Sequence, residues 1–136
     1  MLFINCTQHT LTTEQVAAIY DFMSQYHLTY DGIVNLKDIE PNLFARLSNT
    51  PEDDQDRTTL VVEFAKFINK TDAMFHLPIG SPAFQFQLAS FLQWRFVNSN
   101  GKDSYKICMS HTKRISEEVN GVKTSRFQFE RFIRVE

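Results

Sequence analysis

The sequence predicts a single α/β domain over residues 1–136, with a mostly parallel sheet flanked by helices and a C-terminal antiparallel hairpin. Two observations predict this class. Short apolar runs of strand length alternate with longer segments in which apolar residues recur at helical spacing. This alternation is typical of parallel strands joined by crossover helices. Near the C-terminus, an Asn-Gly pair between two alternating segments indicates a hairpin turn.

A strand and a helix are marked near the N-terminus. Residues 2–6 form a mostly apolar run, and Thr12 followed by Gln15 is a capping-box pattern that predicts a helix start. We expect this helix to end at about Tyr26. Its predicted inward face is formed by Val16, Ile19, Tyr20 and Met23. Residues 32–36 are expected to form a second strand, parallel to the first.

The middle of the chain alternates helices with one further strand. We expect a short helical segment over residues 38–50, an exposed acidic loop over 52–56 and an amphipathic helix over 57–69. Residues 73–77 form the third strand. Ser81-Pro82 supplies an N-cap and a first-turn proline for another helix. The inward residues of that helix are Phe84, Leu88, Phe91, Leu92 and Phe96.

The C-terminal third is predicted to be β-structure. We expect a fourth strand over residues 104–110, a polar loop over 110–114 and hairpin strands over 115–119 and 122–135. Asn120-Gly121 supplies the two-residue turn, because both residues tolerate positive φ. Several apolar side chains compete for inward positions on the last strand, so we expect a bulge near Glu130. The whole pattern is that of a small Rossmann-like sheet with an antiparallel edge.

Composition and charge exclude several classes of function. Apolar residues make up 43% of the chain and charged residues 22%, as in a globular domain. The net charge of −2 gives no reason to expect duplex DNA as a partner, and no apolar run reaches the ~20 residues of a membrane span. Residues 1–101 carry a net charge of −5 and residues 102–136 one of +3. This local positive charge is also compatible with an ordinary solvated hairpin.

The cysteines and the N-terminus indicate a cytoplasmic location. Cys6 and Cys108 fall in predicted strands without the spacing of metal ligands, so we expect free buried thiols rather than a disulfide. The N-terminal apolar run stops at Asn5 and no basic segment precedes it, which argues against a secretory signal. No metal site and no cofactor are predicted.

Three polar loops follow predicted parallel strands, over residues 7–10, 80–82 and 110–114. The carboxyl ends of parallel strands share one edge of a sheet, so we expect these loops to meet there. They combine hydroxyls, two imidazoles, two cations and two helix N-termini, which suits a phosphate-bearing ligand. Neither G-x-G-x-x-G nor a P-loop lysine is present, so a standard NAD or ATP site is disfavoured.

Two of these features also have purely structural explanations. The 80–82 turn could need its residues only for backbone geometry, and His9 could serve only to cap or hydrogen-bond the following helix. His9 is nevertheless the acid–base candidate, because imidazole titrates near neutral pH. His27, at a helix end, and His76, within a strand, are given no catalytic role.

The opening segment, Phe-Ile-Asn-Cys-Thr-Gln-His-Thr-Leu-Thr-Thr-Glu-Gln over residues 3–15, resembles the start of the small standalone CARF (CRISPR-associated Rossmann fold) proteins. Thr112-Lys113-Arg114, followed by Asn120-Gly121 and a Phe-rich last strand, is similar to their closing segment. The likeness also covers the Gly-Ser-Pro turn, while residues 27–72 match only in element order. The segment 127–132 departs from the family pattern, because it contains no histidine. No residue of the last strand is therefore given a role.

The resemblance implies a homodimer that binds a cyclic oligoadenylate, commonly the four-membered ring, across its two-fold axis. It further implies a ring nuclease, which cuts this second messenger of type III CRISPR immunity without a metal. The ribose 2′-OH attacks the adjacent phosphorus and gives a 2′,3′-cyclic phosphate. On this interpretation Lys113 or Arg114 neutralises the phosphorane, and His9 orients or deprotonates the 2′-OH. Ligand contacts are expected from Thr7, Gln8, Thr10, Gly80, Ser81, His111 and Thr112.

The sequence leaves two other functions open. A sensor would bind the same ring without cutting it and pass the signal to another protein. A dimeric scaffold would use the strand-end loops to contact protein. The first alternative needs the same pocket as the nuclease, so only the fate of the ring separates the two.

Overall fold

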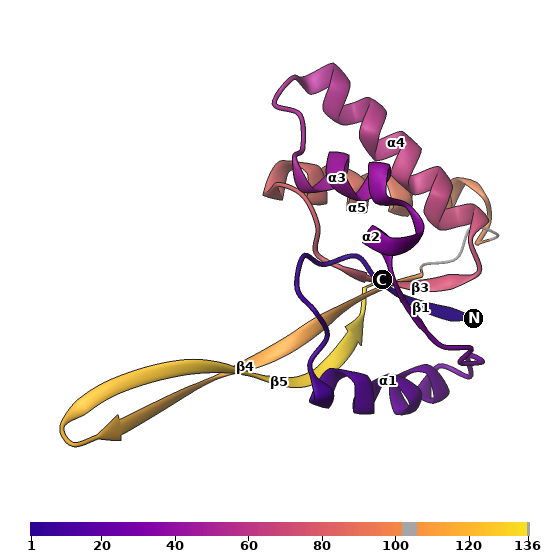
Figure 1. The fold of residues 1–136 in the computed structure, drawn as a ribbon. Coiled ribbons are helices and arrows are strands. Elements are labelled where there is room, and N and C mark those ends of the chain that lie inside the picture. Colours follow the sequence, from indigo (N-terminus) through magenta and orange to yellow (C-terminus); the bar gives the residue numbers. More distant parts are fainter. Residues whose placement is uncertain (102–105, 136) are drawn as a thin grey trace.

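A computed structural model describes residues 1–101 and 106–135, which form an α/β fold around one five-stranded sheet (Figure 1). In chain order the elements are β1 (Leu2–Asn5), α1 (Thr13–Gln25), β2 (Ile33–Asn35), α2 (Leu36–Ile39), α3 (Pro41–Ser48), α4 (Asp54–Lys70), β3 (Ala73–Leu77), α5 (Pro82–Asn98), β4 (Ile107–Val119) and β5 (Val122–Arg134). The strands lie in the order β2-β1-β3-β4-β5. The first four are parallel, and β5 is antiparallel to β4. The predicted class, a mostly parallel sheet flanked by helices with a C-terminal antiparallel pair, is confirmed.

Helices cover both faces of the sheet, and the alternation of side chains in the central strands explains why. Ile4 and Phe75 belong to the core beneath α2–α5, whereas Phe3 and Met74 belong to the core beneath α1. All four are buried. Figure 1 shows α1 on one side of the sheet and α3, α4 and α5 on the other. Both faces of β1 and β3 are therefore core, which accounts for their nearly continuous apolar runs.

Two helix starts predicted from capping residues are confirmed. At α1, the Thr12 side chain accepts a hydrogen bond from the Gln15 N–H, and the Gln15 side chain accepts one from the Thr12 N–H. At α5, the Ser81 hydroxyl accepts from the Phe84 N–H, and Pro82 occupies the first helical position. These local hydrogen bonds depend on residues three apart in the chain, so the sequence alone reveals them.

The inward face of α1 differs from the predicted one. Ile19 and Met23 are buried as expected, but Val16 and Tyr20 are exposed, at 45% and 63%. Phe22 is buried in their place, because it packs against the aromatic core at β5. The buried face of α1 is thus rotated toward the C-terminal strand, relative to the expected face. The position of that strand beside α1 depends on the tertiary fold, so the helical pattern alone does not reveal it.

The exposed loop predicted over residues 52–56 is wrong for its second part, because residues 54–56 form the first turn of a helix. Helix α4 begins at Asp54, and Asp53 caps it by accepting a hydrogen bond of 2.9 Å from the Asp56 N–H. Carboxylates are favourable in a first helical turn because they face the positive end of the helix dipole. The predicted segment 38–50 is divided into α2 and α3, with Pro41 at the start of α3.

β4 is one continuous strand where a strand, a loop and a second strand are predicted. It pairs with β5 from Cys108 to Val119. The loop expected over 110–114 is therefore wrong, because the pairing with β5 keeps this segment extended and no glycine or proline interrupts it. The expected start of the strand, at Ser104 and Tyr105, lies outside the described residues.

The outer part of β4 and β5 leaves the body of the molecule as a two-stranded projection, residues 112–128, which we name the β-arm (Figure 1). Its side chains are exposed apart from the half-buried Ile115. They include three large apolar side chains, those of Val119, Val122 and Phe127. The β-arm carries four basic residues, Lys113, Arg114, Lys123 and Arg126.

The turn and the bulge predicted for this hairpin are both confirmed. Asn120 and Gly121 have φ values of 55° and 78°, as a two-residue turn of this type requires. The pairing register shifts between His111 and Thr112, which leaves Glu130 as the extra residue on β5. The Oε2 atom of Glu130 lies 3.2 Å from the Nε2 atom of His111.

Cys6 and Cys108 are buried free thiols, as predicted. Burial raises the pKa of both thiols, so both are protonated at neutral pH. Across residues 1–101 and 106–135, none of the helices combines the length and the apolar character that a membrane crossing needs.

Candidate functional site

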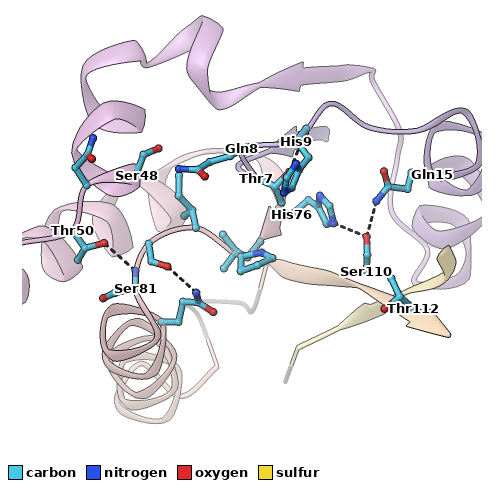
Figure 2. A pocket seen from close by; sticks show the side chains of 16 residues that line it. Thr7, Gln8, His9, Gln15, Ser48, Thr50, His76, Ser81, Ser110 and Thr112 are labelled. Atoms are coloured by element: carbon cyan, nitrogen blue, oxygen red, sulfur yellow. Dashed lines mark hydrogen bonds between the residues drawn. The ribbon is translucent and has the colours of Figure 1, made fainter. Parts of the chain in front are cut away.

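A cavity of about 730 Å³ opens at the carboxyl ends of β1 and β3 (Figure 2). β2 lies on one side of β1 and β3 on the other, so the order of the strands reverses at this point. Crevices at such a switch point are the usual ligand sites of open α/β sheets. The segments after β1, α3 and β3 line the cavity, together with side chains from α1, α5 and β4.

The structure brings most of the predicted site residues together here. The lining includes Thr7, Gln8, His9, Gly80, Ser81 and Thr112. The loop after β1 and the turn after β3 therefore face one space, as the strand-end argument predicts. The predicted residues that do not line the cavity are Thr10, His111, Lys113 and Arg114.

The predicted cationic residues lie on the β-arm rather than in the cavity of their own chain. Lys113 and Arg114 are exposed, and the Arg114 guanidinium donates a 3.3 Å hydrogen bond to the hydroxyl of Ser125 across the hairpin. Side chains alternate along a strand, so Lys113 lies on the face opposite Thr112. Because β4 continues past the sheet edge instead of ending there, it carries both cations away from the cavity.

The turn after β3 owes its residues to backbone geometry. Gly80 has a φ of +85°, and a Cβ atom there would meet Phe84 Cδ1 at 2.8 Å and Thr50 Oγ1 at 2.9 Å. The Ser81 N–H donates to Thr50 Oγ1 at 3.0 Å. These contacts support the structural explanation of the turn. The same backbone nevertheless forms one wall of the cavity (Figure 2).

Asn5, the last residue of β1, is buried, and its side-chain amide is fully hydrogen-bonded. Its Nδ2 donates to the His9 carbonyl at 2.9 Å and to Asn35 Oδ1 at 3.2 Å. Its Oδ1 accepts from the Thr7 N–H at 3.2 Å and lies 3.1 Å from His76 Nδ1. This one amide ties the loop after β1 to both neighbouring strands, and so holds in place a loop that lines the cavity.

His76 on β3 is an almost fully buried imidazole, with 2% of its surface exposed. Its ring stacks on Phe3 at 5.7 Å and meets the edge of Phe132 at 5.3 Å. Because this environment disfavours the charged form, burial lowers the pKa of His76 from 6.5 to about 4. The ring is neutral at physiological pH. Its Nε2 lies 2.8 Å from Ser110 Oγ at the cavity wall (Figure 2).

Ser110 also contacts the start of α1. The Gln15 Nε2 donates a 3.0 Å hydrogen bond to Ser110 Oγ (Figure 2). The other amide atom of Gln15, Oε1, accepts from the Thr12 N–H in the capping box. The capping box therefore fixes which end of the amide faces the cavity.

The described residues that line the cavity include no Asp, Glu, Lys or Arg. The walls present hydroxyl, amide and imidazole groups, which suit uncharged polar partners such as nucleobases and ribose. The buried hydroxyl of Ser48, at the wall, has no hydrogen-bond partner within the described part of the chain. In residues 1–101 and 106–135, no group of three or more His, Cys, Asp or Glu side chains is placed to hold a metal ion.

Sequence reasoning missed Asn5, Gln15 and His76 as site residues. It included Ser110 in the predicted loop 110–114 but gave it no role of its own. One signal was available. Asn5 and His76 are the polar members of otherwise apolar strands, and a buried polar side chain requires a partner. Their contact joins residues 71 apart in the chain, so no local pattern identifies the pair.

Comparisons of the chain with models of protein families, with curated proteins and with solved structures found no match. The cavity and the residues that line it are therefore the basis for inferring a function.

Proposed function

We propose that this chain is a Rossmann-like domain of the CARF type that binds a cyclic oligoadenylate and cleaves it without a metal ion. The observation that carries the proposal is the cavity at the switch point of the sheet. There the loop after β1 and the turn after β3 bring His9 and Ser81, far apart in the sequence, to one rim. This is the juxtaposition that the resemblance of the N-terminal segment and of the Gly-Ser-Pro turn implies.

The size and chemistry of the cavity support a nucleotide ligand. Its volume of about 730 Å³ falls within the range of about 300–1,000 Å³ typical of small-molecule sites. Uncharged amides and hydroxyls suit adenine edges and ribose. A four-membered ring is larger than one such ligand, and two cavities related by a two-fold axis would each take an equivalent half of it. We therefore propose cyclic tetra-adenylate as the preferred ring.

The β-arm supports the homodimer that a two-fold ligand needs. Val119, Val122 and Phe127 are exposed on the arm, and a second copy packed against it would remove them from water. The arm also carries Lys113 and Arg114. In the proposed dimer, each arm reaches across the two-fold axis and brings these cations to the ring held by its partner.

The proposed reaction is an intramolecular attack within the ligand. A ribose 2′-oxygen bonds to the adjacent phosphorus, the bond to the 5′-oxygen breaks, and the product has a 2′,3′-cyclic phosphate. The protein holds the in-line geometry, and Lys113 or Arg114 stabilises the charge of the phosphorane. His9 orients the attacking ribose. Such rings are messengers of type III CRISPR immunity, so the proposal places the protein in the cytoplasm and in antiviral defence.

A second candidate function is a sensor that binds the ring and leaves it intact. One observation favours it: Lys113 and Arg114 do not line the cavity of their own chain. Without a partner arm, the uncharged cavity could bind the ring but would lack a cation for the transition state.

Product analysis separates these candidates. Purified protein is incubated in EDTA with labelled cyclic tri-, tetra- and hexa-adenylate, at protein in excess over ring. Linear products with a 2′,3′-cyclic phosphate support the nuclease. A ring that binds in calorimetry but stays intact supports the sensor. If no ring binds, both functions are excluded and the dimeric scaffold becomes the better explanation.

A further inference from the structure

Three side chains from three adjacent strands form one hydrogen-bonded line that ends at the cavity. Asn5 on β1 and His76 on β3 are register partners. Cys108 on β4 is the register partner of His76 on the other side, and Ser110 follows two residues later on the same face of the sheet. The line runs from Asn5 Oδ1 to His76 Nδ1 at 3.1 Å, and from His76 Nε2 to Ser110 Oγ at 2.8 Å.

The contacts of Asn5 determine which ring nitrogen of His76 carries the proton. The Asn5 Nδ2 donates to two oxygen atoms, one on His9 and one on Asn35, so its Oδ1 is the end that faces His76. An oxygen acceptor requires an N–H opposite it, so Nδ1 of the neutral ring carries the proton. The Nε2 atom then has a free lone pair and can only accept.

The same reasoning determines the direction in which the Ser110 hydroxyl points its proton. Its proton is directed to His76 Nε2, which is an acceptor. Gln15 donates to one lone pair of the oxygen, because the capping box holds the other end of the Gln15 amide. One lone pair remains on Ser110 Oγ, and Ser110 lines the cavity. Ser110 therefore presents an acceptor to the ligand, with a nitrogen base directly behind it.

The other cavity hydroxyls that form hydrogen bonds in the described part of the chain have no nitrogen base behind them. Thr7 Oγ1 lies 2.8 Å from Asn5 Oδ1, and Thr50 Oγ1 donates to a backbone carbonyl at 3.1 Å. The Ser81 hydroxyl caps α5. Among the described cavity hydroxyls whose bonds are recorded, Ser110 alone is hydrogen-bonded to an imidazole.

We propose that Ser110, with His76 behind it and Asn5 orienting His76, takes the proton of the attacking 2′-hydroxyl. This inference rests on the proposed nuclease function and names the groups that perform its proton transfer. It makes Ser110 a catalytic residue, because it touches the reacting hydroxyl. His76 and Asn5 act through it and are positioning residues.

The step balances without any added reactant. The 2′-O–H bond breaks as its proton moves to Ser110 Oγ, and the proton of Ser110 moves to His76 Nε2. The electron pair left on the 2′-oxygen forms the new bond to phosphorus, and the bond from phosphorus to the 5′-oxygen breaks. A water molecule protonates the leaving 5′-oxygen, and the relay gives its proton to water through Ser110, so His76 regains its neutral form. Burial disfavours the charged ring, so His76 holds the proton only transiently, while the 2′-oxygen attacks phosphorus.

Single-turnover cleavage of cyclic tetra-adenylate in EDTA tests the relay. Varying the protein concentration separates the maximal rate from the half-saturating concentration. Ser110→Ala is expected to lower the maximal rate about 100-fold or more, since a positioned base contributes at least that much, and to change half-saturation less than tenfold. Ser110→Thr keeps the hydroxyl and is expected to stay within about tenfold of the wild-type rate. His76→Gln keeps a polar side chain without a basic nitrogen and is expected to lose rate as Ser110→Ala does.

Ser90→Ala, at an exposed serine on α5, is the matched control and should cleave at the wild-type rate. Circular dichroism of each variant checks that it is folded. If the wild type cleaves the ring and Ser110→Ala cleaves it at the same rate, the relay is wrong and the nuclease function is unaffected. If Ser110→Ala binds the ring more weakly but keeps the maximal rate, the relay is also wrong, because Ser110 then acts only in binding. A wild-type chain that binds the ring without cutting it, or that binds no ring, overturns the relay together with the nuclease.

Discussion

The Oδ1 atom of Asn5 lies 3.1 Å from the Nδ1 atom of His76, and both side chains are buried where β1 and β3 pair. Asn5 supplies the acceptor for the Nδ1 atom of His76, whose other ring nitrogen is hydrogen-bonded to Ser110. A buried amide or imidazole that lacks a partner costs about 1–3 kcal/mol in unsatisfied hydrogen bonds. The pair is therefore a structural element, and His76 also lines the cavity.

The first prediction concerns the stability of this pair. Asn5→Leu keeps the approximate volume but removes the acceptor of His76 Nδ1–H and of the Thr7 N–H. We expect the free energy of unfolding to fall by about 2–4 kcal/mol, measured by urea denaturation. Asn42→Leu, at an exposed position of α3, is the control and should change it by less than about 0.5 kcal/mol. Equal effects of the two variants would contradict the assigned hydrogen bonds.

The second prediction concerns the pH dependence of stability. The pKa of His76 is about 4 in the folded chain and near 6.5 when unfolded. Between these values the unfolded chain binds a proton that the folded chain does not, so stability rises with pH and is lost as the pH falls. When the pH is lowered from 7 to 5, we expect the titration of His76 to lower the free energy of unfolding by about 2 kcal/mol.

The variant His76→Gln isolates that contribution, because it has no titratable group at this position. The difference in unfolding free energy between wild type and variant should shrink by about 2 kcal/mol on going from pH 7 to pH 5. Other titrating groups are common to both proteins and cancel. A difference that stays constant over this range would mean that the imidazole is not buried in its neutral form.

The third prediction concerns the turn after β3. Gly80→Ala introduces a Cβ atom 2.8 Å from Phe84 and 2.9 Å from Thr50, at a φ of +85°. We expect a loss of about 2–4 kcal/mol in unfolding free energy, from backbone strain and overpacking together. Gly101→Ala has a similar φ of +79°, and among the described residues the nearest atoms lie 3.9 Å away, so it should show the strain alone, about 1–2 kcal/mol. If the two variants were equally unstable, the close approach at Gly80 would not matter.

Local chemistry explains which parts of the fold could be predicted. The caps at Thr12 and Ser81 and the turn at Asn120-Gly121 each depend on residues a few positions apart, so the sequence displays them directly. The start of α4 at Asp54 was missed because a run of carboxylates resembles an exposed loop as much as a first helical turn. The length of β4 was missed because a partner strand sets it, not its own residues.

The candidate site was likewise predictable where it depends on local pattern and not where it depends on strand pairing. The rule that ligands gather at strand ends correctly predicts that the loops at His9 and Ser81 share a cavity. It places Lys113 there too, and this fails for a single chain because β4 does not end at the sheet edge. His76 and Ser110 were missed as a pair, because their contact spans 34 residues and depends on the register of β3 against β4.

The last prediction concerns the β-arm and tests whether the cavity is completed by a second copy. His9 lines the cavity of its own chain, whereas Lys113 lies on the arm outside it. In the proposed dimer, the His9→Ala and Lys113→Ala homodimers each lack one group at both sites, so both should cleave far more slowly than the wild type. A Lys113→Ala homodimer that keeps the wild-type rate would assign the cation to Arg114, and the Arg114→Ala chain would then replace it in the test. A mixed dimer of the two variants has one site with both groups intact. We expect it to cleave cyclic tetra-adenylate at about half the wild-type rate.

The mixed dimer is obtained by co-expressing the two chains with different affinity tags and purifying over both. A mixed dimer of His9→Ala and Ser110→Ala is the matched control, because both residues line the cavity of their own chain. Each of its sites lacks one group, and it should remain inactive. Activity in the first pair and not in the second would place Lys113 at the partner's cavity. If neither mixed dimer is active, the arm does not cross the two-fold axis, and the cation for the transition state must come from elsewhere in the chain.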